Sequence, residues 1–393
     1  MTPAARIAAA IEILDLHLAG SPAEQALTGW ARTHRFAGSG DRAAIRDHVF
    51  DALRCRRSFG ALGGGGEFET GRALMIGALR DEGISPDTLF TGQGHAPAPL
   101  TPAEASLEPV VLPRDVAIDC PDWLAPLVEG SLGDAFIPVM SLMRQRAPVT
   151  VRVNLSRTTR TGAQKALADE GISTVLHPLA DTALQVTGNP QRLRNSAPYL
   201  DGRVELQDAA SQAVVAMLPL EGGARVLDYC AGGGGKTLAM AARAPGRYVA
   251  HDIAPQRMRD LPERARRAGI RVDLADAARV TALAPYDLVL LDVPCSGSGS
   301  WRRAPEAKWA LTAARLAELQ QIQARILDET HALVAPGGVL AYVTCSMLES
   351  ENGEQIAAFL RRTPGWHCTS HRSFTPLEGG DGFFCALLTR IPA

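Results

Sequence analysis

From Gln207 onward the chain alternates strand-like and helix-like segments, and this alternation constrains the fold more than any other feature. The strand-like runs are apolar and nearly continuous, as strands buried on both faces must be. They read ARVLDYC, RYVAHDI, IRVDLAD, YDLVLLDVP, GVLAYVTC, a weaker WHCTSH and GFFCALLTR. Amphipathic segments at 312–334 and 351–362 predict helices between them. The pattern predicts an α/β, Rossmann-like domain over 207–393, with a doubly wound, mostly parallel sheet.

The region before Gln207 follows two other patterns. Four segments space apolar residues three and four apart, at 6–18, 22–34, 40–59 and 69–83. They predict an all-helical domain over 1–84, followed by a Pro/Gly-rich linker with connecting helices over 85–147. A strand-like VTVRVN, a helical TGAQKALADEG and a strand-like ALQVTG predict a small α+β subdomain over 148–206.

The amino-acid composition limits the cellular compartment and the kinds of partner that we expect. No apolar run approaches the length of a membrane helix, and seven cysteines without framework spacing indicate a reducing compartment. We therefore expect a cytoplasmic protein, with no membrane partner and no feature that demands an oligomer. No CxxC or His/Cys cluster suggests a metal site. A net charge of −2 restricts any nucleic-acid contact to local patches.

A glycine loop joins the first strand of the sheet to the next helix, in VLDYCAGGGGKT. Glycines let backbone N–H groups approach a ligand, and a helix N-terminus follows. A P-loop needs glycine five residues before Gly235, and Cys230 stands there instead. The favoured interpretation is a ligand loop whose nucleotide need not be a phosphate ester, and a purely structural glycine turn is the alternative.

Two aspartates follow the next two strands. Asp252 ends RYVAHD, where a carboxylate can accept hydrogen bonds from ribose hydroxyls, and Asp276 can face an adenine edge. Each aspartate could equally cap the helix that follows it. Together with the glycine loop they indicate a nucleoside-bearing cofactor such as S-adenosylmethionine.

Two cysteines end the fourth and fifth strands, Cys295 in DVPCSGSG and Cys345 in VTCSMLESEN. Neighbouring strands lie about 4.8 Å apart, so the two thiols are expected to converge on one substrate. The other five cysteines lack this context. Cys230 opens the glycine loop, and the remaining four are expected to be structural: Cys55, Cys120, Cys368 and Cys385.

A thiolate beside a methyl donor suits methylation of cytosine at C5. Addition of the thiolate to C6 makes C5 an enamine-like nucleophile, which is covalent catalysis. The adduct needs an acidic group near N3, and Asp292, three residues before Cys295, is placed for that role. The target base must also leave its stack.

At these residues the chain resembles a known family. DVPCSGSGSWRRAPEAKW, VTCSMLESENGEQI and DGFFCALLTR are similar to segments of the RsmB/Nop/Sun family of RNA cytosine-5 methyltransferases, over residues 148–393. The resemblance implies that Cys345 is the nucleophile, that Cys295 assists product release, and that Asp292 matches the family's aspartate. It implies cofactor contacts by the following residues: Cys230, Ala231, Gly232, Gly233, Gly234, Gly235, Lys236, Asp252, Arg257, Asp276 and Asp292.

The chain departs from the family pattern at two places. Gly232 and Gly233 stand where the family has Ala-Pro, so we expect a looser cofactor loop. Gly353 stands where a glutamate usually follows Glu351-Asn352.

The N-terminal region resembles the NusB-like RNA-binding domain of the family's ribosomal-RNA branch, through GDRAAIRDHVFDALRCRR. CPDWL and RVNLSRTTRTGAQKAL resemble its linker and its small RNA-binding subdomain. RNA phosphate contacts are expected from Arg152, Arg157, Arg302 and Arg303. Lys308, like Lys236 one of only three lysines in the chain, matches a family position and is expected to contact RNA with them.

The sequence thus predicts S-adenosylmethionine-dependent methylation of cytosine C5 in RNA, with small-subunit ribosomal RNA as the expected substrate. Three alternatives stay open: the same chemistry on tRNA, a P-loop NTPase, and a non-catalytic RNA-binding assembly factor. Both thiols and Asp292 favour an enzyme over the last of these.

Overall fold

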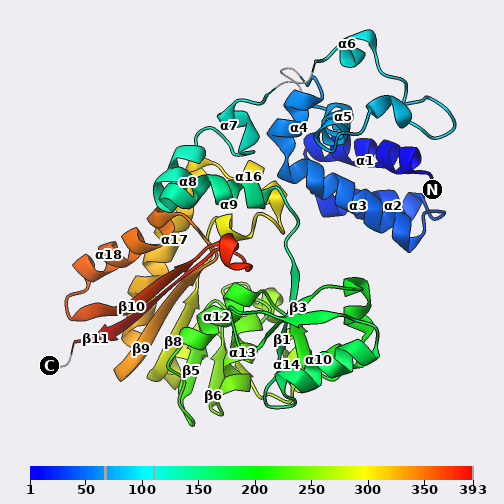
Figure 1. Ribbon diagram of the computed structural model, residues 1–393. Helices are drawn as coiled ribbons and strands as arrows, with labels where there is room; N and C mark the ends of the chain where they lie inside the picture. The colour runs from blue at the N-terminus through cyan, green and yellow to red at the C-terminus, as the bar shows by residue number, and fades with distance from the viewer. Residues whose placement is uncertain (66–68, 109–110, 392–393) are drawn as a thin grey trace. The chain divides into compact units, whose positions relative to one another are not determined.

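The computed structural model describes residues 1–65, 69–108 and 111–391. The chain forms two compact units (Figure 1). Unit 1 comprises Met1–Arg146 and Trp301–Ala310, and unit 2 comprises Ala147–Ser300 and Leu311–Ala393. Residues 66–68 of the expected helical domain and 109–110 of the expected linker lie outside the described residues. None of the described helices has the length and apolar character of a bilayer-spanning segment.

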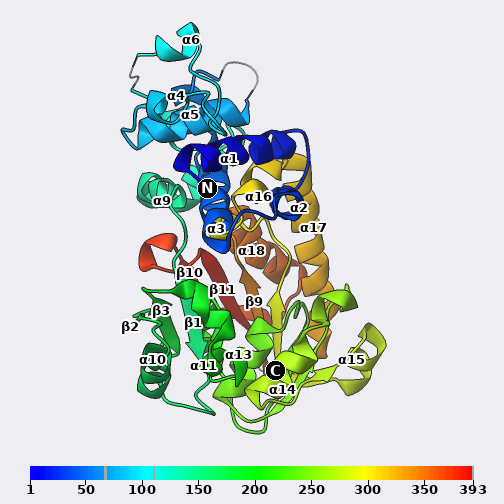
Figure 2. The same cartoon turned by 90° about the vertical axis from the view of Figure 1, so that its right-hand side faces the viewer.

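Unit 1 consists of helices and connecting loops in the part that the structure describes (Figures 1 and 2). Its core holds Ile13, Leu14, Val49, Leu53 and Leu74, all fully or almost fully buried. The α-helices are α1 (Pro3–Leu18), α2 (Ala23–Thr33), α3 (Ser39–Arg54), α4 (Arg56–Leu62), α5 (Gly71–Asp81), α6 (Pro102–Ala105), α7 (Arg114–Ala117), α8 (Ala125–Leu132), α9 (Phe136–Met143) and α16 (Pro305–Ala310). The four predicted helical segments appear as α1, α2, the pair α3–α4, and α5.

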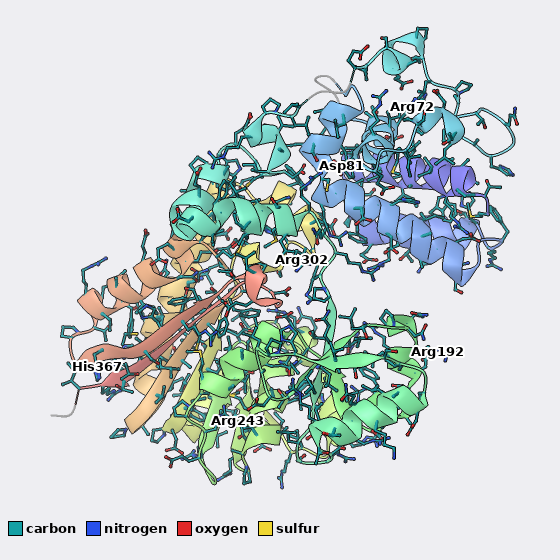
Figure 3. The ribbon with its side chains drawn as sticks, viewed as in Figure 1. Arg72, Asp81, Arg192, Arg243, Arg302 and His367 are labelled. Atoms are coloured by element: carbon teal, nitrogen blue, oxygen red, sulfur yellow. The ribbon has the colours of Figure 1, made fainter. Side chains whose placement is uncertain are left out.

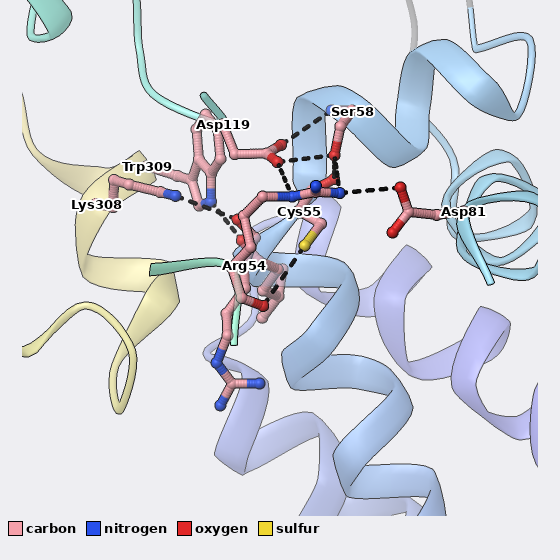
Figure 4. A network of polar contacts seen from close by, with 9 residues as sticks. Arg54, Cys55, Ser58, Asp81, Asp119, Lys308 and Trp309 are labelled. Carbon is pink, nitrogen blue, oxygen red and sulfur yellow. Dashed lines mark hydrogen bonds and ion pairs between the residues drawn. The ribbon is translucent and has the colours of Figure 1, made fainter. Parts of the chain in front are cut away.

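Segment 301–310 belongs to unit 1, although the sequence places it within the C-terminal domain. Lys308 Nζ donates to the Arg54 carbonyl at 3.2 Å, and Trp309 Nε1 donates to the Leu53 carbonyl at 2.7 Å (Figure 4). These carbonyls lie in the last turn of α3, where no intrahelical donor is available and a cation is favoured. The segment therefore completes the end of α3.

Unit 2 contains a small sheet and a large one. The small sheet has the order β2-β3-β1-β4, with all pairs antiparallel. Its elements are β1 (Val149–Val153), α10 (Arg160–Asp169), β2 (Thr174–Leu176), β3 (Ala183–Val186), α11 (Ala197–Leu200) and β4 (Val204–Leu206). The sequence pattern indicated β1, α10 and β3, and it missed the three-residue strands β2 and β4.

The large sheet has seven strands in the order β10-β11-β9-β8-β5-β6-β7. Strands β5 to β9 are parallel, and β11 pairs antiparallel with both β9 and β10. The strands are β5 (Arg225–Asp228), β6 (Arg247–Ala250), β7 (Asp273–Leu274), β8 (Tyr286–Asp292), β9 (Val334–Thr344), β10 (Trp366–Phe374) and β11 (Phe383–Arg390). This order confirms the predicted doubly wound, mostly parallel sheet.

Helices cover both faces of this sheet (Figure 1). Alternate strand residues point to opposite faces, so Leu288 packs with the residues of α12 and α13 while Val289 packs with those of α17 and α18. Arg243 at the end of α13 donates to the carbonyl of Val215 in α12 at 2.5 Å (Figure 3). The helices are α12 (Ala209–Met217), α13 (Gly235–Arg243), α14 (Leu261–Ala268), α15 (Ala277–Leu283), α17 (Ala313–Thr330) and α18 (Gly353–Arg362).

Candidate active site

The loops after β5, β8 and β9 meet at one edge of the large sheet. In a parallel sheet the carboxyl ends of neighbouring strands lie at the same edge, and ligands bind where the strand order reverses. Here the order reverses between β5 and β8, since β6 and β9 lie on opposite sides of this pair. The glycine loop follows β5, Cys295 follows β8, and Cys345 follows β9.

The two cysteines lie in direct contact, with 3.4 Å between the two Sγ atoms. A hydrogen bond from the Cys295 thiol lowers the pKa of Cys345, although burial opposes this. The same contact, together with burial and the charge of Glu351, raises the pKa of Cys295. These opposite directions favour Cys345 as the sulfur that carries the negative charge, with Cys295 as its hydrogen-bond partner.

Lys236 and Asp292 form an ion pair beside the thiols. Lys236 Nζ lies 2.7 Å from Asp292 Oδ2, and it lies 4.8 Å from the centre of the Phe383 ring. Burial disfavours the Lys236 cation, but the charge and hydrogen bond of Asp292 outweigh burial and raise its pKa. The Lys236 charge lowers the pKa of Cys345, whereas the charge of Asp292 raises it by more. The pair thus places both a cation and a carboxylate beside the nucleophilic sulfur.

Glu351 joins the two cysteine loops, a role that the sequence did not reveal. Its side chain is fully buried. Oε1 accepts from Ser296 N at 2.8 Å and from Gln323 Nε2 at 3.0 Å, and Oε2 accepts from the hydroxyls of Ser296 and Ser346. Because Ser296 follows Cys295 and Ser346 follows Cys345, one carboxylate fixes both loops. Only the resemblance to the family's Glu-Asn segment marked this residue.

The glycine loop folds back on itself before α13. Gly232 and Gly234 have φ of +51° and +77°, in the left-handed region that favours glycine. A Cβ at Gly234 would lie 2.2 Å from the Leu261 side chain, so this position excludes larger residues. Gly232 N donates to Asp252 Oδ2 at 2.9 Å. The loop thus places backbone groups at the N-terminus of α13, where Arg264 donates to the Gly233 carbonyl and Arg152 to the Gly235 carbonyl.

Asp228, at the end of β5, is a second residue that the sequence reasoning missed. Its Oδ2 accepts from Thr237 Oγ1 at 2.6 Å, whereas its buried Oδ1 has no hydrogen-bond partner. Burial raises the pKa of Asp228 to about 7. A buried polar atom without a partner marks a place where a ligand can supply the missing hydrogen bond. An aspartate directly before the glycine loop is the signal that could have identified it.

The other cofactor candidates lie around the same loop. Besides holding Gly232, Asp252 accepts from Ala254 N at 2.9 Å through Oδ1, and Arg257 lies 3.3 Å from its Oδ2. Asp276 caps α15, because its Oδ1 accepts from Arg279 N at 2.8 Å. Burial raises the pKa of Cys230, which suits a packing role more than a reactive one. The roles of these residues toward a cofactor remain predictions.

Of two predicted RNA contacts in unit 2, Arg152 needs correction, whereas the exposed Arg157 stays a prediction. Arg152 is 4% exposed and donates to Gln207 Oε1 at 2.5 Å and to the Gly235 carbonyl at 2.8 Å. Arg157 donates to the carbonyls of Ala268 and Asp201. These guanidinium groups bind backbone and side-chain acceptors of their own unit, so Arg152 in particular is not available to a phosphate. Arg152 instead links strand β1 of the small sheet to the first residue of α13, through its hydrogen bond to the Gly235 carbonyl.

Two more corrections concern unit 1. Arg302 is 5% exposed and donates to the carbonyls of Gln145 and Arg146. Lys308 is 1% exposed, and burial lowers its pKa. Neither side chain presents its charge at the surface of the unit, so neither serves as a phosphate contact. Arg303 is exposed, and its expected contact with RNA stays a prediction.

Four cysteines outside the site were expected to be structural. Cys55, Cys120 and Cys385 are buried, and burial raises the pKa of Cys120 to about 11 and of the other two to about 12. Cys368 is half-buried on β10. All seven cysteines are free thiols, and no group of side chains in the described ranges could hold a metal ion.

The strand order, the glycine loop at the switch point and the adjoining thiols together define a Rossmann-like methyltransferase. The comparisons with known proteins agree. Residues 215–389 match the model of the family described as 16S rRNA methyltransferase RsmB/F, and residues 120–191 match its ferredoxin-like domain. The chain belongs to the RsmB/F family of methyltransferases.

Relatives of known name cover much of the chain. Ribosomal RNA small subunit methyltransferase B of Klebsiella pneumoniae is 33% identical over 286 residues, which are 69% of this chain and 66% of the relative. The protein of the same name from Salmonella arizonae is 34% identical over 284 residues, with the same shares. The chain thus matches about two thirds of the length of these relatives.

Solved structures show the same fold. PH0851 has a TM-score of 0.76 at 23% identity, over 99% of both chains. NSun6 from Pyrococcus horikoshii with SFG has a TM-score of 0.62 at 18% identity, over 70% of this chain and 99% of that one. Because PH0851 covers nearly the whole chain, its fold resembles both units.

The raised pKa of Asp228 leads to a prediction about stability. Its folded-state pKa of about 7 exceeds the ordinary 3.8, so stability from this group is full below pH ~4 and is lost as pH rises through ~7. In the wild type, ionisation of Asp228 lowers the free energy of unfolding by roughly 2 to 3 kcal/mol between pH 5 and pH 8. The Asp228→Asn variant is expected to lack this decrease. Urea unfolding without cofactor measures this. Asp276→Asn, at an exposed cap, is the control; an equal effect there would contradict the assignment.

Proposed function

We propose that the protein transfers a methyl group from S-adenosylmethionine to C5 of a cytosine in 16S ribosomal RNA. The observation that carries the proposal is the thiol pair, 3.4 Å apart, beside the Lys236–Asp292 ion pair. Two thiols, a cation and a carboxylate at the switch point are the groups that C5 methylation through a covalent adduct requires. The names of the relatives support ribosomal RNA as the substrate.

The residues around the glycine loop fit the cofactor. The partnerless Asp228 Oδ1 can accept from an ammonium group, and Asp252 and Asp276 can face the ribose and the adenine. Residues 230–236 supply backbone groups and Lys236, and Arg257 borders the loop at Asp252. The cofactor supplies an electrophilic methyl group on a sulfonium sulfur.

The protein's own residues carry the proposed chemistry. The Cys345 thiolate adds to C6 of the cytosine, and the electron pair of the C5–C6 double bond moves toward N3, which takes a proton from the Asp292–Lys236 pair. C5 would then bond to the methyl carbon as the bond from that carbon to the sulfonium sulfur breaks, and its electron pair would stay on the sulfur of the departing thioether. N3 returns its proton to the Asp292–Lys236 pair. Transfer of the C5 proton to water as base then re-forms the C5–C6 double bond and expels Cys345 as a thiolate. A hydrogen bond from Cys295 to the departing sulfur assists this last step.

RNA recognition is proposed for the parts outside the large sheet. The base must be turned out of its stack to reach the sulfur of Cys345. We assign RNA binding to the NusB-like unit 1 and to the small sheet, with Arg303 as one contact. We expect the protein to act in the cytoplasm and as a monomer.

The test is transfer of labelled methyl from S-adenosylmethionine to total RNA from cells that lack this protein, followed by size separation. We expect label in the small-subunit ribosomal band, recovered as 5-methylcytosine. Label in the tRNA band would keep the chemistry and overturn the substrate. Absence of label from both naked RNA and small-subunit particles would overturn the proposal.

A further inference from the structure

A groove of about 640 Å³ crosses the surface of unit 1, and nothing in the proposed chemistry uses it. One wall is the alanine-rich start of α1, and the other walls come from the α2–α3 connection and from residues 93–96. Trp30 lies at its base with 6% of its surface exposed, whereas Phe36 at its rim is 71% exposed. Among the exposed large apolar side chains of the described residues, Phe36 is the one aromatic ring, so it offers a π-face to a ligand at the groove.

The aromatic rings of the groove are held in fixed positions. Trp30 and His34 stack with their centroids 4.2 Å apart and their planes 7° from parallel. His34 meets Phe36 edge-on, with centroids 5.7 Å apart and planes 77° apart. Trp30 Nε1 donates to Glu12 Oε2 at 3.0 Å, and His34 Nδ1 lies 2.9 Å from the Trp30 carbonyl. The Phe36 ring therefore projects from an ordered stack.

Three exposed arginines near these rings have no acceptor for their charge. The side chains of Arg32, Arg35 and Arg42 make no hydrogen bond or ion pair with any residue that the structure describes, whereas Arg6 pairs with Asp41 and Arg46 with Glu24. Arg32 and Arg35 flank His34 in the sequence, and Arg42 lines a smaller cavity of about 300 Å³ that shares Trp30 with the groove. None of the three arginines lines the groove itself, but their unpaired charges add positive charge to the surface of the same unit, which suits a phosphate backbone.

We propose that this aromatic groove binds one unpaired base of single-stranded RNA, stacked on Phe36. The neighbouring phosphates lie on Arg32, Arg35 and Arg42, and the exposed Glu12 carboxylate can accept from an amino group of the base. The inference rests on the proposed function, because it assigns a contact for the RNA substrate. It fits RNA better than a peptide, since the unit combines an exposed π-face at the groove with three unneutralised cations outside it.

Binding of a fluorescein-labelled adenosine octamer RNA to the full chain, measured by anisotropy at low salt, tests the groove. Phe36→Ala is expected to weaken binding at least about five-fold, as loss of one base–aromatic stack does. Phe36→Leu is expected to weaken binding as much as Phe36→Ala, because the π-face is lost even though leucine keeps an apolar surface. Phe36→Tyr, which keeps the π-face, is expected to bind with wild-type affinity. Ile253→Ala, which removes a 91% exposed apolar side chain in unit 2, is the matched control and is expected to have no effect.

Wild-type affinity in either Phe36→Ala or Phe36→Leu would overturn the inference, the second by showing that apolar contact alone suffices. The octamer assay does not depend on methyl transfer. Weakened binding in the Phe36 variants would therefore support the groove even if ribosomal RNA received no label, and label transfer with unchanged octamer binding would leave only the proposed function standing. In methyl transfer, Phe36→Ala is expected to raise KM for RNA without lowering kcat.

Discussion

Replacing Cys345 with alanine is expected to lower methyl transfer by at least about a thousand-fold, because without the thiolate C5 has no route to an enamine-like nucleophile. Cofactor affinity is expected to stay at the wild-type value, since Cys345 follows β9 and the glycine loop follows β5. Single-turnover transfer of labelled methyl to small-subunit ribosomal RNA measures the first quantity, and calorimetric titration with S-adenosylmethionine measures the second.

Cys368→Ala is the matched control for this variant. Cys368 is a half-buried thiol on β10, away from the strand ends that carry the site, so its loss is expected to leave transfer unchanged. Near-normal transfer by Cys345→Ala would contradict its assignment as nucleophile. If Cys345→Ala still transferred methyl and Cys295→Ala did not, Cys295 would be assigned as the nucleophile instead.

Replacing Cys295 with alanine is expected to make a covalent protein–RNA adduct accumulate. The two Sγ atoms lie 3.4 Å apart in a hydrogen bond, so the Cys295 thiol can donate to a departing Cys345 thiolate. Attack on C6 is expected to continue more slowly, because Cys345 remains although the hydrogen bond that most lowers its pKa is lost. A denaturing gel with labelled RNA is expected to show a slowly migrating band that nuclease removes.

The double variant Cys295→Ala/Cys345→Ala is the control for the adduct, because it lacks the sulfur that forms the bond. Its lane is expected to show free RNA alone. Persistence of the band in the double variant would place the covalent bond on another residue. Absence of the band in Cys295→Ala, with transfer continuing through repeated turnovers, would show that release does not depend on Cys295.

The large sheet was predictable because each of its central strands is buried on both faces and so is apolar without interruption. Strand β7 is limited to Asp273–Leu274 at the sheet edge, so the predicted strand over 270–276 was too long. The meeting of Cys295 and Cys345 also followed from the sequence, since neighbouring strand ends share an edge. What periodicity could not supply was the hydrogen bond that makes the two sulfurs inequivalent.

The buried cations could not be predicted from local sequence. Arg152 alternates with apolar residues along β1 as a surface arginine would, yet its acceptor is the carbonyl of Gly235, 83 positions away. Lys308 donates to Arg54, 254 positions away. The sequence indicates where a helix ends, but it does not indicate which distant side chain will complete its last carbonyls. Phosphate contact was the wrong inference for both residues.

The carboxylate of Glu351 has a consequence for the timing of the proposed reaction. Because it binds Ser296 and Ser346 at once, we expect the two loops to move together and the distance between the sulfurs to stay nearly constant when a base binds or leaves. Bond formation at one sulfur and hydrogen-bond donation by the other are then expected without loop movement between the two steps. The slow steps of each turnover are therefore expected to be the entry of the base into the site and its exit, and not a conformational change of the protein.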